Sequence, residues 1–453
     1  MNAEARRALN QLLQMQLPDG AWPWFPGGGA NDFITLYVTT GFGRLRNMGA
    51  DLELRPALRA LDRLDGWINQ NYQAIKQRQG LEKNNLSPSI CLYLYGRSFF
   101  LNDKAVADQN REAFTYFANQ AKQYWTKLGN RQSQGHLALA LHRMSDRVTP
   151  MEIVKSLTER SQQDDEMGMF WREASDSWWW YQAPIETQAL MIEVYQEVAK
   201  DDGKVEALKI WLLKQKQTQN WKTTKATADA CYALLMQGTS QLASDELITV
   251  QLGNLEVNPE GVEAGTGFYE HVFVANEIQP DMGNIKLTKT DDGIGWGSIH
   301  WQYLESIDKI QAYEGTPLTL KKRLFQKRNT TEGPVLTEIS GPLNVGDELV
   351  TRVELRVDRD MEFIHLKDYR GSGTEPVNVI SRYQYQDGLA YYQSTRDTAS
   401  HFFIDYLPRG TYVFEYSVRI QNRGKFESGI AEIQSMYAPE FNSHSESVEI
   451  TVQ

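Results

Sequence analysis

The sequence predicts a multidomain protein, α then β, in which an α/α toroid of paired helices precedes a β-module and an immunoglobulin-like antiparallel β-sandwich. Apolar residues recur at helical spacing to about residue 240, and they alternate as in strands after about residue 244. A turn with an aromatic residue also recurs between the predicted helices. We therefore predict three domains, residues 1–240, 244–315 and 316–453.

The helical half contains about ten predicted helices of ordinary length. In "AEARRALNQLLQMQ", Leu9, Leu12 and Leu13 lie on one face, and "IETQALMIEVYQEVAK" places Ile185 and Ile192 on one face in the same way. Such amphipathic segments are typical of helices that pack in layers.

The turns of the helical half share one chemistry, as in Gly20–Trp22 and Gly168–Trp171. Glycine permits a positive φ angle, and the indole fills the gap between successive helix pairs. A threonine is expected to begin each following helix: Thr35, Thr187 and Thr227. Repeated pairs of this kind favour a ring. "GAWPWFPGGG" is then a corner plug and a surface loop, because the strand and the Lys-Ser/Thr of a phosphate-binding loop are missing around it.

The β half is predicted from alternation. One face of "DELVTRVELRVD" carries Leu349, Thr351, Val353, Leu355 and Val357. "HFFIDYLPRGTYVFEYSVRI" is interpreted as a hairpin that turns at Leu407–Gly410, and "NIKLTKTDDGIGWGSIHWQYL" as two strands around the turn that begins at Asp291. "ESVEITVQ" is the last strand, and a break near Glu314–Pro317 separates the two β domains.

Composition and charge exclude several classes of protein. The chain has 453 residues, a formal net charge of −11 and no basic run, so no nucleic-acid partner is expected. Its two cysteines, Cys91 and Cys231, form no zinc pattern and are interpreted as small buried residues. No apolar run approaches the ~20 residues that cross a bilayer, and the first residues lack the apolar core of a signal peptide. No metal and no cofactor are expected.

The quoted stretches resemble the C-terminal third of the alpha-2-macroglobulin family, bacterial branch. "LPDGAWPWFPGGGANDFITLYVTTGFGRL", "YQAPIETQALMIEVY" and "WLLKQKQTQNWKTTKATADACYALL" are similar to helices of its thioester-carrying domain. "GDELVTRVELRVDRDMEFIHLKD", "GTYVFEYSVRIQNRGKF" and "SMYAPEFNSHSES" are similar to its terminal macroglobulin-like domain. The resemblance covers essentially the whole chain, so residues 244–315 correspond to part of a CUB-like module.

The resemblance implies a protease-trapping inhibitor and not an enzyme. A protease cleaves a bait region of such proteins, collapse encloses the protease, and in many members a thioester formed within a Cys-x-Glu-Gln motif acylates it. Neither Cys91 nor Cys231 is followed by Glu-Gln. The chain is therefore expected to be a fragment that lacks the first helices of the ring. The implied partners are target proteases and the rest of the same polypeptide, and the implied location is the periplasm or the cell surface. The target protease, the oligomeric state, the anchor and the presence of a thioester stay open.

The resemblance also implies a shielding loop. In bacterial relatives a loop of the terminal domain covers the thioester, and "QSMYAPEF" is similar to it. Met436 and Tyr437 are then the shielding residues. The alternative is that both side chains pack inside the edge of the sandwich.

Three alternative hypotheses about ligand and metal sites depend on other residues. A possible aromatic surface for a glycan comprises Trp22, Trp24, Trp178, Trp179, Trp180 and Tyr181, with Glu173 and Asp176 as acid and base and Trp171 beside them. Asp229-x-Cys231 is half of a zinc pattern whose histidine is missing from the next helix, since His271 and His300 lie in the β region. The paired aspartates lack the spacing of a magnesium–diphosphate site. His136 and His142 are six positions apart, whereas a pair of ligands on one helix face is three or four apart, so they are interpreted as surface residues and not as metal ligands.

Overall fold

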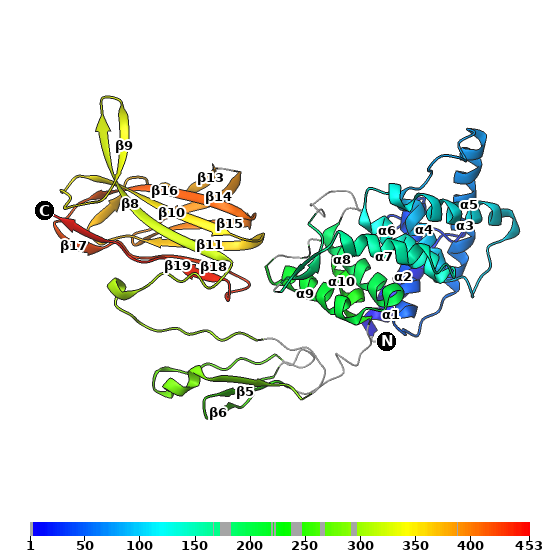
Figure 1. Ribbon diagram of the computed structural model, residues 1–453, viewed down its shortest axis with the longest axis horizontal. Helices are drawn as coiled ribbons and strands as arrows, with labels where there is room; N and C mark the ends of the chain where they lie inside the picture. Colours follow the sequence, from blue (N-terminus) through cyan, green and yellow to red (C-terminus); the bar gives the residue numbers. More distant parts are fainter. Residues whose placement is uncertain are drawn as a thin grey trace. The chain divides into compact units, whose positions relative to one another are not determined.

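The computed structural model describes residues 3–165, 167–172, 183–218, 221, 223–236, 247–262, 268–290, 297–386 and 388–453. These residues separate into two compact units, one drawn from residues 1–213 and 221–296 and the other from 214–220 and 297–453. Helices come first and antiparallel sheets follow, which confirms the predicted order of secondary structure (Figure 1).

Ten α-helices lie in the described part of the chain. They are α1 (Ala3–Gln14), α2 (Asp32–Asn47), α3 (Arg55–Gln77), α4 (Pro88–Ser98), α5 (Asp108–Tyr124), α6 (Arg131–Arg143), α7 (Thr149–Glu159), α8 (Pro184–Val194), α9 (Asp202–Thr218) and α10 (Thr224–Leu235). A π-helical turn, Tyr195–Ala199, extends α8.

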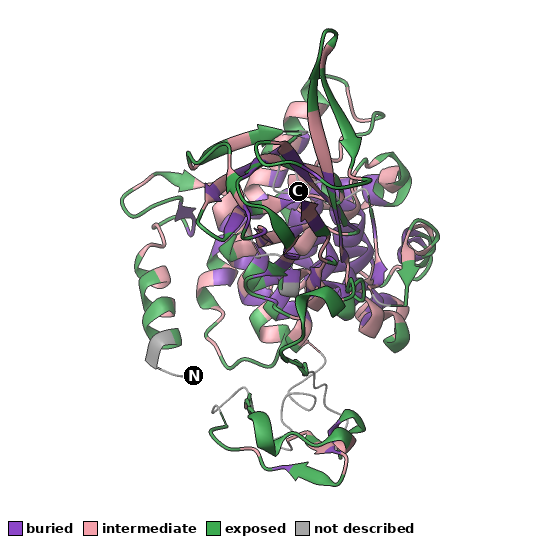
Figure 2. Cartoon of the chain, turned by 90° about the vertical axis from the view of Figure 1, so that its left-hand side faces the viewer, coloured by how far each residue is buried: buried purple, intermediate pink, exposed green. Residues whose placement is uncertain are grey.

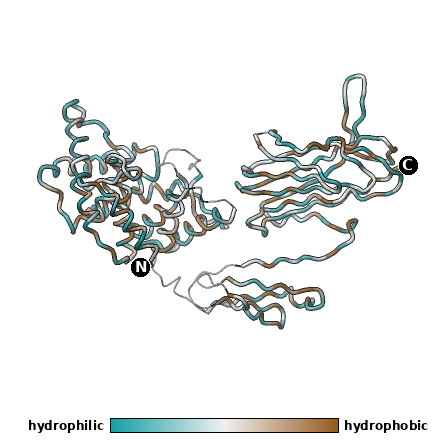
Figure 3. Tube along the Cα trace, turned by 180° about the vertical axis from the view of Figure 1, so that it is seen from behind, coloured by the Kyte–Doolittle hydropathy of each residue, from teal (hydrophilic) through white to brown (hydrophobic). Residues whose placement is uncertain are grey.

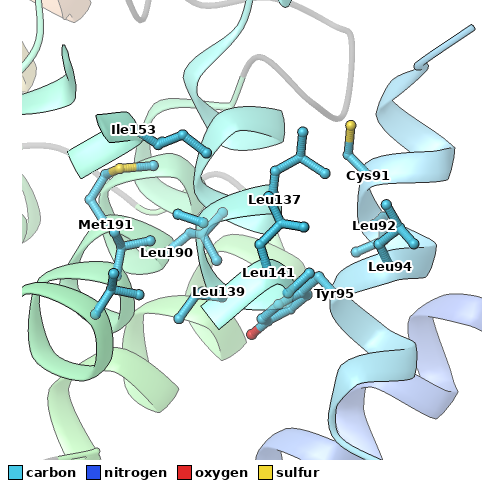
Figure 4. Packing of buried hydrophobic residues seen from close by; sticks show 14 of the residues in the cluster. Cys91, Leu92, Leu94, Tyr95, Leu137, Leu139, Leu141, Ile153, Leu190 and Met191 are labelled. Atoms are coloured by element: carbon cyan, nitrogen blue, oxygen red, sulfur yellow. The ribbon is translucent and has the colours of Figure 1, made fainter. Parts of the chain in front are cut away.

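The helices form two classes by burial. In α4, α6 and α8 every residue of 90–98, 132–141 and 186–194 is buried, so these helices are covered on all sides. By contrast α3 and α7 bury one stripe at three- to four-residue spacing. Packing proceeds from α2 to α4, α6, α8 and α10 in turn. Leucines of α6 interleave with Leu190 and Met191 of α8 and with Tyr95 of α4 (Figure 4).

Glycines allow α2 and α4 to approach closely. A Cβ atom on Gly96 would lie 2.4 Å from the Thr40 hydroxyl oxygen, and one on Gly43 would lie 2.5 Å from the Phe99 ring. Any larger side chain at either position would push the helices apart.

Trp22 fills the corner between α1 and α2. Its backbone N–H donates to Thr35 Oγ1 at 2.8 Å, and its indole N–H donates to the Leu12 carbonyl at 2.9 Å. The ring is fully buried and lies against Phe42. The corner-plug interpretation therefore holds for this residue.

The threonines do not begin their helices, and that prediction is wrong. Asn31 caps α2, with its side chain accepting from the Ile34 N–H at 2.9 Å. Pro184 begins α8, where a missing N–H costs nothing, and Thr223 rather than Thr227 caps α10.

A small sheet follows the helices, in the order β6 (Leu255–Val257), β5 (Thr249–Leu252) and β7 (Ile285–Thr288). The strand predicted after the Asp291 turn is not formed in residues 297–306, where Trp301, Tyr303 and Leu304 are exposed. That prediction is wrong for these residues, because an apolar strand needs a paired neighbour to bury it.

The C-terminal unit is a sandwich of two antiparallel sheets. The first has the order β12 (Thr374–Pro376), β16 (Gly410–Ile420), β10 (Glu348–Val357), β8 (Leu318–Thr330) and β9 (Gly333–Glu338). The second has the order β13 (Arg382–Gln386), β14 (Leu389–Thr395), β15 (Ala399–Leu407), β11 (Met361–Tyr369), β18 (Ala431–Ser435) and β19 (Asn442–His444). A two-stranded sheet, β17 (Gly424–Glu427) with β20 (Glu449–Val452), contains the predicted last strand.

The predicted hairpin at Leu407–Gly410 is wrong. Its strands, β15 and β16, belong to different sheets, so the turn crosses from one layer of the sandwich to the other. A hairpin and a crossover between sheets show the same alternation of apolar and polar residues, because in both cases each strand points one face at the shared core.

Hydrophobic and hydrophilic stretches follow one another along the strands of the sandwich (Figure 3), and the end of the β8–β9 hairpin that projects from the sandwich is exposed (Figure 2).

A buried ion pair joins the two sheets. Lys322 Nζ on β8 donates to Asp368 Oδ1 on β11 at 2.6 Å, and both side chains are buried. The ammonium also donates to the carbonyls of Tyr369, Ser428 and Gly429. Burial raises the pKa of Asp368 despite this partner and the hydroxyl of Tyr416.

Candidate functional site

The loop between β18 and β19 presents the two predicted shielding residues. Ala438 and Phe441 are buried and anchor the loop, with the Ser435 N–H donating to the Phe441 carbonyl at 3.0 Å. Met436 is 58% exposed and Tyr437 is 79% exposed. The alternative that both side chains pack inside the edge of the sandwich is wrong.

Strand β11 holds this loop from the side. The Met436 N–H donates to the Phe363 carbonyl at 2.9 Å. The rings of Phe363 and Tyr437 meet edge to face, 5.1 Å between centroids and 82° between planes. Such a pair contributes about 0.5–1.5 kcal/mol beyond its buried area.

Phe363 itself adopts a costly backbone conformation. Its φ angle is 55°, in the left-handed region that bulky side chains rarely occupy and that costs about 1–3 kcal/mol. Residues kept in such conformations concentrate at binding and catalytic sites. The loop is therefore held in one conformation by β11, and it exposes the side chains of Met436 and Tyr437.

The two outer faces of the sandwich differ in chemistry. On the first sheet, Arg352 bonds Glu415 at 2.6 Å and Lys327 bonds Glu348 at 2.8 Å, as on an ordinary wet surface. On the second sheet an aromatic row runs across four strands in direct register: Tyr383, Tyr392, Phe403 and His365. Phe363 and Tyr437 lie beside this row, so the displayed loop belongs to the aromatic face.

The predicted aromatic surface of the helical half is not assembled from Trp22 and Trp24. Trp22 is buried, so that part of the prediction is wrong, whereas Trp24 is 62% exposed on the following loop. Trp171 is also buried, with its indole N–H donating to the Leu157 carbonyl at 2.9 Å. Trp178, Trp179, Trp180, Tyr181, Glu173 and Asp176 lie outside the described residues.

A buried charge network, which the sequence analysis missed, joins the inner helices. Glu193 on α8 accepts hydrogen bonds from the hydroxyls of Tyr95 at 2.5 Å and Tyr232 at 3.2 Å, and from Arg143 at 2.7 Å. Burial raises the pKa of Tyr95 well above its ordinary value. The Arg44 guanidinium lies over the rings of Tyr95 and Tyr232. The available signal was a lone charge inside an apolar helix, as with Glu193 in "ALMIEVY".

The same network accounts for the half zinc pattern. Asp229 pairs with Arg44 at 2.5 Å and with Lys225 at 2.8 Å, while Cys231 is exposed on α10. Burial raises the pKa of Asp229, but the charges of Arg44 and Lys225 outweigh it and hold the pKa below its usual value. Among the described residues no three His, Cys, Asp or Glu side chains converge as metal ligands.

Two predictions of exposure are reversed. Cys231 was expected to be buried and is exposed, because α10 leaves one face open. His136 was expected at the surface and is buried against Tyr95, 5.0 Å between ring centroids, because α6 is covered on all sides. Cys91 is buried as predicted. No described helix is long and apolar enough to cross a membrane.

Comparison with known proteins identifies the sandwich. Residues 318–440 match the model of the bacterial alpha-2-macroglobulin MG10 domain, a range that runs from β8 into the Met436–Tyr437 loop. A curated relative, an alpha-2-macroglobulin homolog of Nostoc sp., is 21% identical over 471 residues, which cover 96% of this chain and 23% of that protein. The chain thus spans about a quarter of the length of the curated relative it matches.

Solved structures show the same likeness. Trypsin-activated alpha-2-macroglobulin from Escherichia coli is 12% identical with a TM-score of 0.46, over 100% of this chain and 30% of that one. Escherichia coli alpha-2-macroglobulin activated by porcine elastase is 14% identical with a TM-score of 0.41, over 100% of this chain and 39% of that one. The matched sandwich, together with a relative that aligns along nearly the whole chain, shows that this chain is similar to the bacterial alpha-2-macroglobulins and that its terminal sandwich matches their MG10 domain.

Proposed function

We propose that this chain is the C-terminal part of a protease-trapping inhibitor, without catalytic activity of its own, whose terminal sandwich shields a reactive centre on the helical domain. The observation that carries this proposal is the Met436–Tyr437 loop, which displays an almost bare phenol on a strained and hydrogen-bonded support. A large exposed aromatic held in one place is typical of a contact with another surface. Target proteases and the remainder of the same polypeptide are the proposed partners, and the cell envelope is the proposed location.

We also propose that the helical domain, residues 1–240, is an α/α toroid of the thioester-carrying type. Support comes from the succession of inner helices α2, α4, α6, α8 and α10, and from side-chain bonds that join the first to the last. Arg44 on α2 pairs with Asp229 on α10, and Asn47 donates to the Tyr232 hydroxyl at 3.3 Å.

One face of α10 supports the proposal that further helices of the whole protein pack beside α10 and α2. Its exposed residues are uncharged and mostly small: Thr224, Thr227, Ala228, Cys231 and Leu235. They recur at helical spacing, as on a face that packs against another helix. On α2, a Cβ atom at Gly41 would meet open space.

The middle module, residues 244–315, is proposed to be a half-sandwich that strands from elsewhere in the polypeptide complete. Its three strands place aliphatic side chains on one face: Val250, Leu252, Leu255, Val257, Ile285 and Leu287. Leu255, Ile285 and Leu287 are exposed in this chain, whereas a sheet face that stays in contact with solvent usually carries polar side chains. The third domain, residues 316–453, contains the matched sandwich.

Capture of a protease by the full-length protein tests the shielding role. Tyr437→Gly should increase the reactivity of the shielded centre toward a small amine before any protease is added, and should lower the yield of covalently captured protease. Tyr383→Gly is the matched control, because it removes an exposed tyrosine of the same sheet without touching the loop. Equal reactivity and equal capture in the two variants would contradict the proposal.

A further inference from the structure

Two histidines form a pair on the outer face of the second sheet, and one of them, His365, is paired with Gln434 on the strand that leads into the Met436–Tyr437 loop. His365 Nε2 on β11 and His401 Nδ1 on β15 are 2.9 Å apart. Their ring planes differ by 5° and their centroids are 5.2 Å apart, so with facing nitrogens this close the rings meet edge to edge in nearly one plane. Such a contact needs one nitrogen that carries hydrogen and one that does not. It is lost when both facing nitrogens are protonated.

The pair joins β11 to β15 next to the strained residue of the site. His365 also stacks on Phe403 of β15, with centroids 4.7 Å apart and planes within 1°. Two positions earlier on the same face of β11 is Phe363, whose carbonyl holds the Met436 N–H. The ladder between the two strands keeps one register from Glu362 to Ile364, but Phe363 between them has no pair in it.

The electrostatic surroundings favour neutral rings. Burial, then His401 and Lys367, lowers the pKa of His365. Burial, then Lys367, Arg396 and Arg370, lowers the pKa of His401. The charged and titratable groups on this face of the packed elements are Lys367 and its partner Tyr369 on β11, Arg370 after it, Arg396 between β14 and β15, Asp405 on β15, Glu432 on β18 and Tyr392 on β14.

We propose that the His365–His401 pair is a proton-operated latch for the Met436–Tyr437 loop. Protonation of both rings separates them, loosens β11 from β15 at Phe363 and frees the loop that Phe363 holds. The biological consequence rests on the proposed function, since a shield that opens in acid would uncover the centre beneath it. The latch itself requires only the loop geometry.

The direction of the pH effect follows from the lowered pKa values. Histidine in an unfolded or opened segment titrates near its ordinary pKa of about 6.5, so opening takes up protons at lower pH. The closed latch is therefore favoured above about pH 6.5 and is lost progressively as the pH falls through the lowered pKa values of the two rings.

Amide hydrogen exchange of the whole chain tests the latch, with protection factors corrected for the intrinsic rate at each pH. Protection of a peptide that covers residues 431–441 should fall by about tenfold or more between about pH 8 and about pH 5. His401→Gln and His365→Gln keep a polar side chain without its titration, so their protection should be flat over this range. His142→Gln, in the helical unit, should behave as the parent protein does.

Constant protection in the parent protein would overturn the latch, as would an equal fall in His401→Gln. Neither measurement involves a protease or a thioester. A failure of Tyr437→Gly to change capture would therefore count against the proposed function and leave the latch standing.

Discussion

Arg44 on α2 and the buried Asp229 on α10 form a largely covered ion pair at 2.5 Å, although 185 positions separate them in the chain. The contact joins α2 and α10, the first and last of the inner helices, which are far apart in the sequence. Lys225 completes the pairing of Asp229 at 2.8 Å. The integrity of the helical domain should therefore depend on these charges.

Removal of one partner should destabilise the helical domain strongly. Asp229→Ala leaves the Arg44 guanidinium buried without its carboxylate, and breaking a buried pair in this way costs about 3–5 kcal/mol. Denaturant unfolding followed by circular dichroism measures the loss. The double variant Arg44→Met with Asp229→Ala should lose less than the sum of the single losses, and strict additivity would contradict the coupling.

Acid should act on the same pair. The pKa of Asp229 lies below its usual value in the folded protein, because Arg44 and Lys225 outweigh its burial. Its contribution to stability is thus present above about pH 3.9, the ordinary aspartate pKa, and is lost as the pH falls through the lowered value. The difference in unfolding free energy between the parent protein and Asp229→Asn should shrink over that window, and a constant difference would count against the ion pair.

The corner plug and the neighbouring loop offer a matched pair of substitutions. Trp22→Ala empties a fully buried site and should cost about 3–5 kcal/mol, whereas Trp24→Ala on the exposed loop should stay within about 0.5 kcal/mol. Thermal and denaturant unfolding of the two variants check this. A glycan-binding role for these residues would predict a common loss of binding from both.

Removal of one partner of the Lys322–Asp368 ion pair should destabilise the sandwich more than removal of both partners. Lys322→Met strands the Asp368 carboxylate inside the sandwich and should cost about 3–5 kcal/mol. Lys322→Met combined with Asp368→Leu replaces both charges with apolar groups and should recover most of that loss. Unfolding curves for the sandwich in which the double variant is less stable than the single one would refute this account.

The two thiols should react at different rates. Burial raises the pKa of Cys91 to about 12, despite the nearby Ser133 hydroxyl, so its thiol stays protonated and covered. Cys231 is exposed. Iodoacetamide should therefore modify one thiol of the folded chain of residues 1–453, and Cys231→Ser should remove that reaction until the chain is unfolded. Mass spectrometry of the tryptic peptides assigns the site.

Alternation and helical spacing predicted much of this fold because they report burial on one face. All five residues foreseen on one face of β10, from Leu349 to Val357, are buried. Alternation does not indicate which strand pairs with which, so it predicts a hairpin at Leu407–Gly410 although this turn crosses between the sheets. Pairing is decided by the twist and contacts of whole sheets, which no local window contains.

The candidate site was predictable in position and not in shape. Resemblance singled out Met436 and Tyr437, but no pattern in "QSMYAPEF" distinguishes a displayed tyrosine from a packed one. The support comes from Phe363, far away in sequence, and from a backbone angle that only the structure shows. The Arg44–Asp229 pair escaped for the same reason, since its partners meet across the chain.

A photo-crosslinking amino acid placed at position 437 of the full-length protein tests the shielding contact most directly. We predict one dominant intramolecular cross-link to the helical domain, which is lost once a protease has been captured. The same probe at Tyr383 should give no such product. The absence of a cross-link to the helical domain, or a cross-link that is unchanged after capture, would contradict the proposal that this loop covers a reactive centre.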